Sequence, residues 1–257
     1  MVALYHTFFY QPLFNLLVFI YNTIAAHDLG IAIIVLTVLI RILLYPLSLK
    51  SIRAQKAMQD LQPKLEAIKK QFPGSKEKQA EATMKLYKEE KVNPLSSCLP
   101  LLLQLPFFIA LFQIFNNSAK PENLSALYPF VVNPGALNQQ GLWGMVNLGV
   151  PSPWLALLAG AAQFWQGHML VRKKPAIKGE ASKDEEFATI MNQQMTYVMP
   201  VVTVVIGWTF PAGLALYWFL TTLLLALQQW YIFHKDGHKD RAQKDAIIKP
   251  TDSGGAG

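Results

Sequence analysis

Five separate apolar runs, each close to the length of a membrane-crossing helix, constrain this chain more than any other feature of its sequence. A helix needs about 20 mostly apolar residues to cross the hydrocarbon core of a bilayer. Only 15% of the 257 residues are charged, against about 25% in a typical soluble domain. The pattern predicts an all-α, polytopic membrane protein with a core of five transmembrane helices. The runs cover roughly residues 30–49, 95–115, 153–171, 195–210 and 214–233.

The basic residues of the connecting segments predict how the chain is oriented. Three segments are rich in lysine and arginine: residues 51–92 with ten, and residues 172–193 and 234–257 with five each. Residues 1–29 have none, and residues 116–152 have only Lys120. The positive-inside rule therefore predicts that the three basic segments are cytoplasmic and that the N-terminus lies outside. The same topology accounts for the net charge of +7, which gives little support for nucleic-acid binding.

Residues 1–28 are expected to form an N-terminal amphipathic helix at the outer membrane surface. The stretch is apolar, but it lacks the basic start and the small-residue cleavage site of a signal peptide. Gln11, Asn15 and Asn22 fall within about 40° of one another on a helical wheel. One polar stripe on an apolar helix is typical of an interfacial helix. A sixth transmembrane span is the alternative, and it would leave the orientation of the later segments unchanged.

Residues 51–92 are expected to form a cytoplasmic helical hairpin. The strong turn signal Phe72-Pro73-Gly74-Ser75 divides two segments with apolar residues at helical spacing, and Pro63 should perturb the first helix locally. Ten basic residues stand against six acidic ones. Such a hairpin either simply obeys the positive-inside rule or docks anionic lipid, ribosomal RNA or an incoming chain. The sequence alone favours the first interpretation.

Arg41 lies in the middle of the first apolar run. An arginine at the centre of a transmembrane helix costs roughly 2.5–3.5 kcal/mol on insertion scales, and no predicted span has an Asp or Glu to pair with it. Lys50 marks the cytoplasmic end of the span, about 13 Å away at 1.5 Å per residue, which disfavours snorkelling to the interface. The sequence therefore predicts that Arg41 faces a hydrated cavity open to the cytoplasm.

Other polar residues of the spans are candidates for the wall of the same cavity. Each of them alone is equally consistent with an ordinary hydrogen bond between helices. Together with Arg41, and without any acid, they predict a positively charged groove that attracts anionic passengers. The candidates are Thr37 in the first span, Gln104 in the second, Gln163 and Gln166 in the third, and Tyr217, Trp218, Thr221 and Gln228 in the fifth.

No set of residues in the chain points to bond-making chemistry. The sequence has no Ser/His/Asp set, no metal-ligand cluster and no Gly-rich phosphate loop. We therefore expect a protein without enzymatic activity, metal or cofactor. A passive anion channel or small-solute transporter is the competing class. Ion-coupled transport would call for inverted repeats and intramembrane acids, which the chain lacks, but a passive anion pathway stays open.

Four separated segments resemble conserved parts of the YidC family of membrane-protein insertases. Residues 92–108, VNPLSSCLPLLLQLPFF, closely resemble its second conserved span, and residues 37–47 resemble the first. Residues 61–64 resemble the opening of its cytoplasmic hairpin, and residues 210–218 its last span. The segments occur in the family's order, and the resemblance covers roughly residues 28–233.

The resemblance implies a bacterial inner-membrane insertase with five core helices around a groove open to the cytoplasm and the lipid. Arg41 matches the single arginine of that groove. Thr37, Tyr217 and Trp218 match further groove residues, and Gln163 matches one more loosely. The implied partners are nascent membrane proteins with acidic translocated segments, the ribosome, the Sec translocon and the lipid bilayer.

The expected organisation is that of a short member of the family. Residues 1–28 form the interfacial helix, residues 29–233 the insertase core, and residues 234–257 a disordered cytoplasmic tail. Relative to the family, we expect neither the large extracellular domain of many Gram-negative members nor the cleavable lipoprotein signal of many Gram-positive ones.

Overall fold

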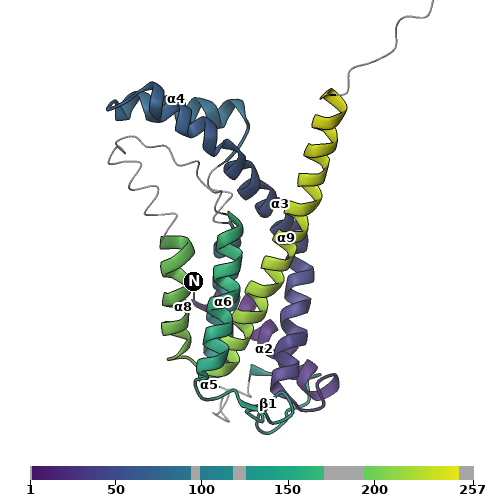
Figure 1. The fold of residues 1–257 in the computed structure, drawn as a ribbon. Coiled ribbons are helices and arrows are strands. Elements are labelled where there is room, and N and C mark those ends of the chain that lie inside the picture. Colours follow the sequence, from purple (N-terminus) through teal and green to yellow (C-terminus); the bar gives the residue numbers. More distant parts are fainter. Residues whose placement is uncertain (1, 94–98, 118–125, 171–193, 249–257) are drawn as a thin grey trace, which may run out of the picture.

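The computed structural model describes residues 2–93, 99–117, 126–170 and 194–248, and they are mostly helical (Figure 1). An N-terminal helical segment consists of α1, a π-helical turn η1, and α2. A long helix and a shorter one form the hairpin, and in the described residues five more helical elements and a small antiparallel strand pair follow. The elements are α1 Val2–Tyr5, η1 His6–Tyr10, α2 Gln11–Thr23, α3 Leu29–Gln71, α4 Lys76–Glu89, α5 Leu99–Asn117, β1 Gln140–Gly141, β2 Val146–Asn147, α6 Pro153–Leu170, η4 Gln194–Val198, α8 Met199–Gly207 and α9 Ala212–Ile248.

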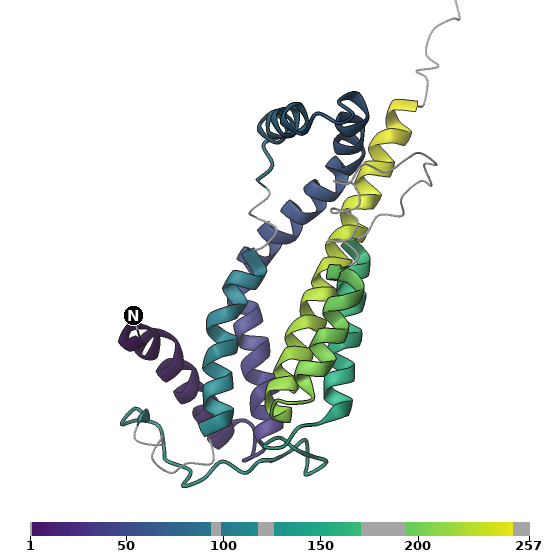
Figure 2. The same ribbon diagram turned by 90° about the vertical axis from the view of Figure 1, so that its left-hand side faces the viewer.

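The long helices run side by side, with the hairpin at one end and the β1–β2 loop at the other (Figures 1 and 2). Helix α6 packs against α8 and α9, and α3 packs against α9 and α2. Helix α5 contacts α2 and α9. The architecture is the helical one that the sequence predicts.

The buried core is concentrated at the loop end of the bundle. One large cluster joins α2, the first part of α3, the last part of α5, the loop and the first part of α9. Phe14, Leu36 and Leu214 are among its fully buried side chains. Toward the hairpin, a second cluster has only Ile52, Leu225 and Ile232 as its buried members.

Helix α3 is one uninterrupted helix of 43 residues, which includes the predicted first span and the first half of the hairpin. Pro46 and Pro63 both lie inside it without ending it. The chain turns at residues 72–75, where the sequence predicts a turn, and Gly74 there has a φ of +77°. Gly is favoured at this position because positive φ is strained for other residues.

Among the described helices, α3 and α9 are long and apolar enough to cross a membrane. Shorter apolar helices cover Leu102–Asn116 and Thr196–Gly207. The number of five spans therefore stays a prediction. Helix α9 continues to Ile248, although the composition of residues 234–257 predicts a disordered tail. Propagating an existing helix costs much less than starting one, and residues 234–248 have no proline to stop it. Residues 249–257 lie outside the described part.

The polar stripe of α2 binds the backbone of the loop that follows α5. The Gln11 and Asn15 side-chain amides donate to the Ala126 carbonyl at 3.1 and 3.0 Å. The Asn15 Oδ1 accepts from the Tyr128 N–H at 2.6 Å, and Asn22 donates to the Val132 carbonyl at 2.7 Å. The stripe thus has an internal role that wheel geometry did not predict, and the position of α2 relative to the membrane stays a prediction.

Candidate functional site

Arg41 reaches from the middle of α3 to α9. Its Nε donates to the Thr221 hydroxyl at 2.8 Å, and its Nη2 donates to the Thr221 carbonyl at 2.6 Å. Leu29 and Lys50 are about 18 and 13 Å away along the helix, at 1.5 Å per residue. The guanidinium is therefore held far from both ends of the span by neutral oxygen atoms.

Helix α5 contributes to this site together with α3 and α9. The Gln104 side-chain amide donates to the Tyr217 hydroxyl, and the Thr221 hydroxyl donates to the Gln104 Oε1 at 3.5 Å. Tyr217 is fully buried, whereas Arg41 and Gln104 are half-buried. We call Arg41, Gln104, Tyr217 and Thr221 the Arg41 cluster. The structure thus brings together four of the candidate residues named from the sequence, and it identifies Thr221 as the one that binds the arginine.

Two further predicted residues lie beside the cluster without a hydrogen bond to it. The Thr37 side chain is buried one turn before Arg41, and its hydroxyl donates to the Ile33 carbonyl of its own helix at 2.6 Å. The Trp218 ring packs edge-on against the Phe108 ring of α5, with centroids 5.2 Å apart. Thr37 thus lies on the same helix as Arg41, and Trp218 packs α9 against α5.

Gln163 belongs to a different contact. Its Oε1 accepts a hydrogen bond from the Thr203 hydroxyl, which joins α6 to α8. The structure does not bring Gln163 to the Arg41 cluster. The sequence does not give the rotation of a helix about its own axis, so it cannot predict which neighbouring helix a lone glutamine faces.

A second polar layer lies nearer the hairpin, between α3, α6 and α9. The Ser48 hydroxyl donates to the Gln228 Oε1 at 2.9 Å, and the Gln229 side chain donates to the Gln166 carbonyl at 3.4 Å. Gln59 donates to the carbonyls of the last two residues of α6. Gln166 and Gln228, predicted to line the Arg41 cavity, belong to this layer instead. Sequence reasoning missed Gln229, although a Gln-Gln pair in an apolar run was a usable signal.

The positive charge of Arg41 has no acidic counterpart in the apolar parts of the helices around it. The sequence places no Asp or Glu in residues 29–52, 99–117, 153–170, 194–207 or 212–235. The nearest acid ahead of it on α3 is Asp28, about 20 Å away at 1.5 Å per residue. In a low dielectric, an uncompensated charge attracts an opposite one strongly. The arrangement can therefore bind an anionic group. Within the described residues, no group of His, Cys, Asp or Glu side chains could hold a metal ion.

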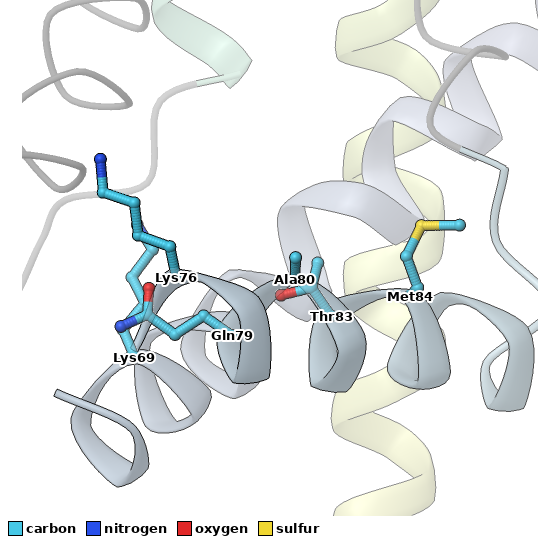
Figure 3. A pocket seen from close by; sticks show the side chains of 6 residues that line it. All are labelled: Lys69, Lys76, Gln79, Ala80, Thr83 and Met84. Carbon is cyan, nitrogen blue, oxygen red and sulfur yellow. The ribbon is translucent and has the colours of Figure 1, made fainter. Parts of the chain in front are cut away.

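A cavity of about 440 Å³ lies on the hairpin, far from Arg41. Figure 3 shows the Lys76 and Met84 side chains on the same side of α4, with Lys76 at the start of the helix and Met84 farther along it. Two lysines and an exposed methionine make this surface both basic and apolar. The hydrated groove around Arg41 stays a prediction. The cavity is lined by Lys69, Lys76, Gln79, Ala80, Thr83 and Met84.

Comparison with known proteins places this chain among membrane protein insertases. The family model described as 60Kd inner membrane protein matches residues 19–239. Membrane protein insertase YidC of Fusobacterium nucleatum subsp. nucleatum is 34% identical over 233 residues, which are 89% of this chain and 98% of that protein. Membrane protein insertase YidC of Magnetococcus marinus is 36% identical over 234 residues, which are 90% of this chain but 36% of that protein.

A solved structure has the same fold. It is a crystal structure of an active YidC insertase in which the first transmembrane domain is resolved. It is 26% identical, with a TM-score of 0.54, and the match covers 88% of this chain and 46% of that one. The chain thus spans almost the whole of one relative and less than half of the longer ones.

Proposed function

Because the chain belongs to the 60Kd inner membrane protein family and its relatives are YidC membrane protein insertases, we propose that Arg41 receives nascent membrane proteins on their way into the bilayer. The chain is a membrane protein insertase of the bacterial inner membrane. The observation that carries the proposal is that, within the described residues, the Arg41 guanidinium donates its hydrogen bonds to the neutral oxygens of Thr221, about 13 Å from the level of Lys50. An acidic segment of a client protein would be its missing counter-ion.

The proposed mechanism needs no bond to form or break. Moving a carboxylate into hydrocarbon is costly, and pairing with a cation offsets part of this cost. A client segment that reaches Arg41 has already crossed about 13 Å of the membrane beside polar side chains. Burial of the client's apolar span in lipid would then drive its release from the arginine. The Arg41 cluster supplies neutral partners that hold the guanidinium between clients.

We further propose that the hairpin end faces the cytoplasm and the loop end faces outward. The distribution of basic residues supports this orientation. Clients would then enter from the hairpin end. The ribosome and the Sec translocon are the expected partners there, and the basic, partly apolar hairpin surface is suited to such contacts.

The test is reconstitution of purified protein into liposomes with two single-span clients, one with an acidic translocated tail and one with a neutral tail. Replacing Arg41 with Ala should reduce insertion of the acidic client by about tenfold, which corresponds to a net pairing energy of about 1.4 kcal/mol. The neutral client should change less than twofold. Arg41→Lys should retain most activity, because it keeps the charge.

Arg53→Ala is the matched control, since it removes one positive charge from the same helix at an exposed site. It should leave both clients unaffected. Equal loss of the two clients in Arg41→Ala would refute the electrostatic role. Chloride flux that depends on Arg41, with insertion unchanged by the substitution, would instead support a passive anion channel.

A further inference from the structure

The loop at the end of the bundle opposite the hairpin has no charged residue over 27 consecutive positions. Residues 126–152 contain no Asp, Glu, Lys, Arg or His. The same stretch exposes large apolar side chains: Phe130 is 76% exposed, Val132 75%, Trp143 80% and Met145 72%. Connecting segments in contact with water are normally rich in polar side chains, and apolar groups gathered at one exposed site usually mark an interaction surface.

The backbone of this loop is bonded to the protein at many points. Its first part is bonded to the polar stripe of α2 through the carbonyls of Ala126 and Val132 and the N–H of Tyr128. The Asn138 N–H donates to the Tyr21 hydroxyl at 3.0 Å. Polar side chains of α2 that would otherwise face outward thus form hydrogen bonds with the backbone groups of the loop.

Two helix N-termini fix the rest of the loop. The Asp28 carboxylate, which caps α3, accepts from the N–H groups of Leu142 and Trp143 at 2.9 and 2.6 Å. The first N–H groups of α9, those of Ala212 and Gly213, donate to loop carbonyls at residues 150 and 148, both at 2.9 Å. Helix N-terminal N–H groups have no partner within the helix, so loop and helices satisfy each other.

A segment in contact with lipid should expose apolar side chains, and its backbone polar groups should be hydrogen-bonded within the protein. This loop has both properties. Irregular backbone is tolerated at membrane depth only where its polar groups find partners in the protein. We propose that residues 126–152 lie in the lipid interface of the leaflet opposite the hairpin, with Phe130, Val132, Trp143 and Met145 in contact with lipid. The partner of this surface is the bilayer itself.

The length of α6, which the sequence predicts as the third span, is consistent with this depth. Helix α6 begins at Pro153, where the loop ends, and its 18 residues extend about 27 Å at 1.5 Å per residue. The hydrocarbon core is about 30 Å thick. A helix of this length puts the exposed Trp154 near the boundary with the headgroups, where tryptophan is enriched. The loop continues from there across the end of the bundle (Figure 2).

The surface is continuous with the apolar faces of the helices. Leu157 and Leu158, in the first turns of α6, are also exposed. The exposed polar side chains of the loop, Asn133, Asn138 and Gln140, are suited to headgroups and water rather than acyl chains. A loop with both kinds of side chain is expected at the interface and not at the bilayer centre. A loop held at the interface in this way would fix the depth of the helix bundle in the membrane.

The proposal can be tested with nitroxide spin labels on single cysteines in a Cys98→Ser background. The labelled variants are Val132→Cys and Met145→Cys, with Asn138→Cys as the matched polar control in the same loop. Met84→Cys on the exposed hairpin surface is the aqueous reference. Each protein is reconstituted into vesicles of phosphatidylethanolamine and phosphatidylglycerol. Accessibility to oxygen, which concentrates in lipid, and to a water-soluble nickel chelate is measured by power saturation.

Labels at 132 and 145 should be severalfold less accessible to nickel than the label at 84, and more accessible to oxygen than the label at 138. Nickel accessibility equal to that at 84 would overturn the proposal. Low accessibility to both reagents would also overturn it, since it would mean that protein, such as a second copy of the chain, covers the loop.

A measurement without cysteines guards against misfolded variants. In vesicles with brominated acyl chains, the Trp143→Tyr variant should lose quenchable emission relative to the unsubstituted chain. If the Trp143→Tyr variant lost only emission that the brominated lipid does not quench, Trp143 would lie in water, which would contradict the proposal. Neither readout depends on insertion activity, so failure here would leave the role of Arg41 untouched.

Discussion

Asp28 should contribute more to stability than its place at the edge of the bundle implies. Its Oδ1 accepts from the N–H groups of Ile31 at 3.0 Å and Leu142 at 2.9 Å, and its Oδ2 accepts from that of Trp143 at 2.6 Å. Leu142 and Trp143 adopt φ values of +55° and +58°, a conformation that costs a non-glycine residue about 1 kcal/mol or more. The carboxylate holds this strained turn against the start of α3.

The magnitude follows from these three bonds. Loss of an N-cap side chain costs about 1 kcal/mol. A hydrogen bond to a charged group contributes about 1.5–3 kcal/mol, which we reduce to about 1 for each loop bond because Asp28 is partly exposed. Asp28→Ala should therefore cost about 3 kcal/mol. Asp28→Asn should cost about 1–2 kcal/mol, since its oxygen can still serve Ile31 and Leu142 while its NH₂ group faces the Trp143 N–H.

The same contact predicts a dependence on pH. Partial burial alone would raise the pKa of the Asp28 carboxyl, but backbone N–H groups, Trp143 first among them, outweigh it and hold the pKa below its usual value. A lowered pKa in the folded state means that the contribution is complete above the unfolded value of about 4 and is lost as the pH falls through the folded pKa. Asp28→Asn should remove this part of the acid sensitivity.

The assay is unfolding of the purified protein in mixed micelles by increasing SDS, with limited proteolysis of the loop as a second readout. Glu77→Gln is the control, because it removes a carboxylate from the first turn of α4, at an exposed site away from the loop. It should change the unfolding free energy by less than about 1 kcal/mol. If Asp28→Asn and Glu77→Gln behaved alike at neutral pH, the reasoning about the loop would be refuted.

Two further substitutions test the helix contacts. Thr221→Val removes the acceptor of the Arg41 Nε bond but keeps the charge, so it should lower stability by about 1.5 kcal/mol in SDS unfolding and preserve insertion of an acidic client. Thr222→Val, at the adjacent buried threonine, is its control. If Thr221→Val reduced insertion as much as Arg41→Ala does, the hydroxyl would matter more than the charge. Gly160→Leu should separate α6 from α8, because even a Cβ there would lie 2.4 Å from the Val204 Cγ2 and 3.1 Å from the Pro200 carbonyl oxygen. We expect a cost at the upper end of about 1–3 kcal/mol, against little change for Ala161→Leu on the exposed face of α6; equal stability of the two variants would contradict the packing described here.

Hydropathy and turn signals were enough to predict the helices, because both depend on local sequence. The turn at residues 72–75 and the start of α6 at Pro153 lie where the sequence predicts them. The predicted span 30–49 and the first helix of the predicted hairpin are one continuous helix, α3, because a change in hydropathy along the chain does not end a helix. The helical extension of α9 to Ile248 was missed for a similar reason.

The candidate site was predictable only in part. A lone arginine in an apolar run can be recognised as a candidate site residue from the sequence alone. Gln104 and Tyr217 are hydrogen-bonded to each other, and Gln104 is linked to Arg41 through Thr221. The roles of Thr221 and Gln163 depend on how α9 and α6 are rotated about their axes. Rotation is set by contacts between helices, such as the close approach of Gly160 to Val204, and no single-helix pattern encodes them. The use of the α2 stripe for the loop depends on a partner more than 100 residues away.

The uneven distribution of the core has a consequence for motion. Most buried side chains lie near the loop, and few lie between the helices toward the hairpin. Proteins open locally where few apolar contacts must be broken. The helices should therefore separate at the hairpin end at a small fraction of the global unfolding energy, while the loop end stays closed. In hydrogen exchange, amides of α3 and α9 near the hairpin should exchange first and those near the loop last.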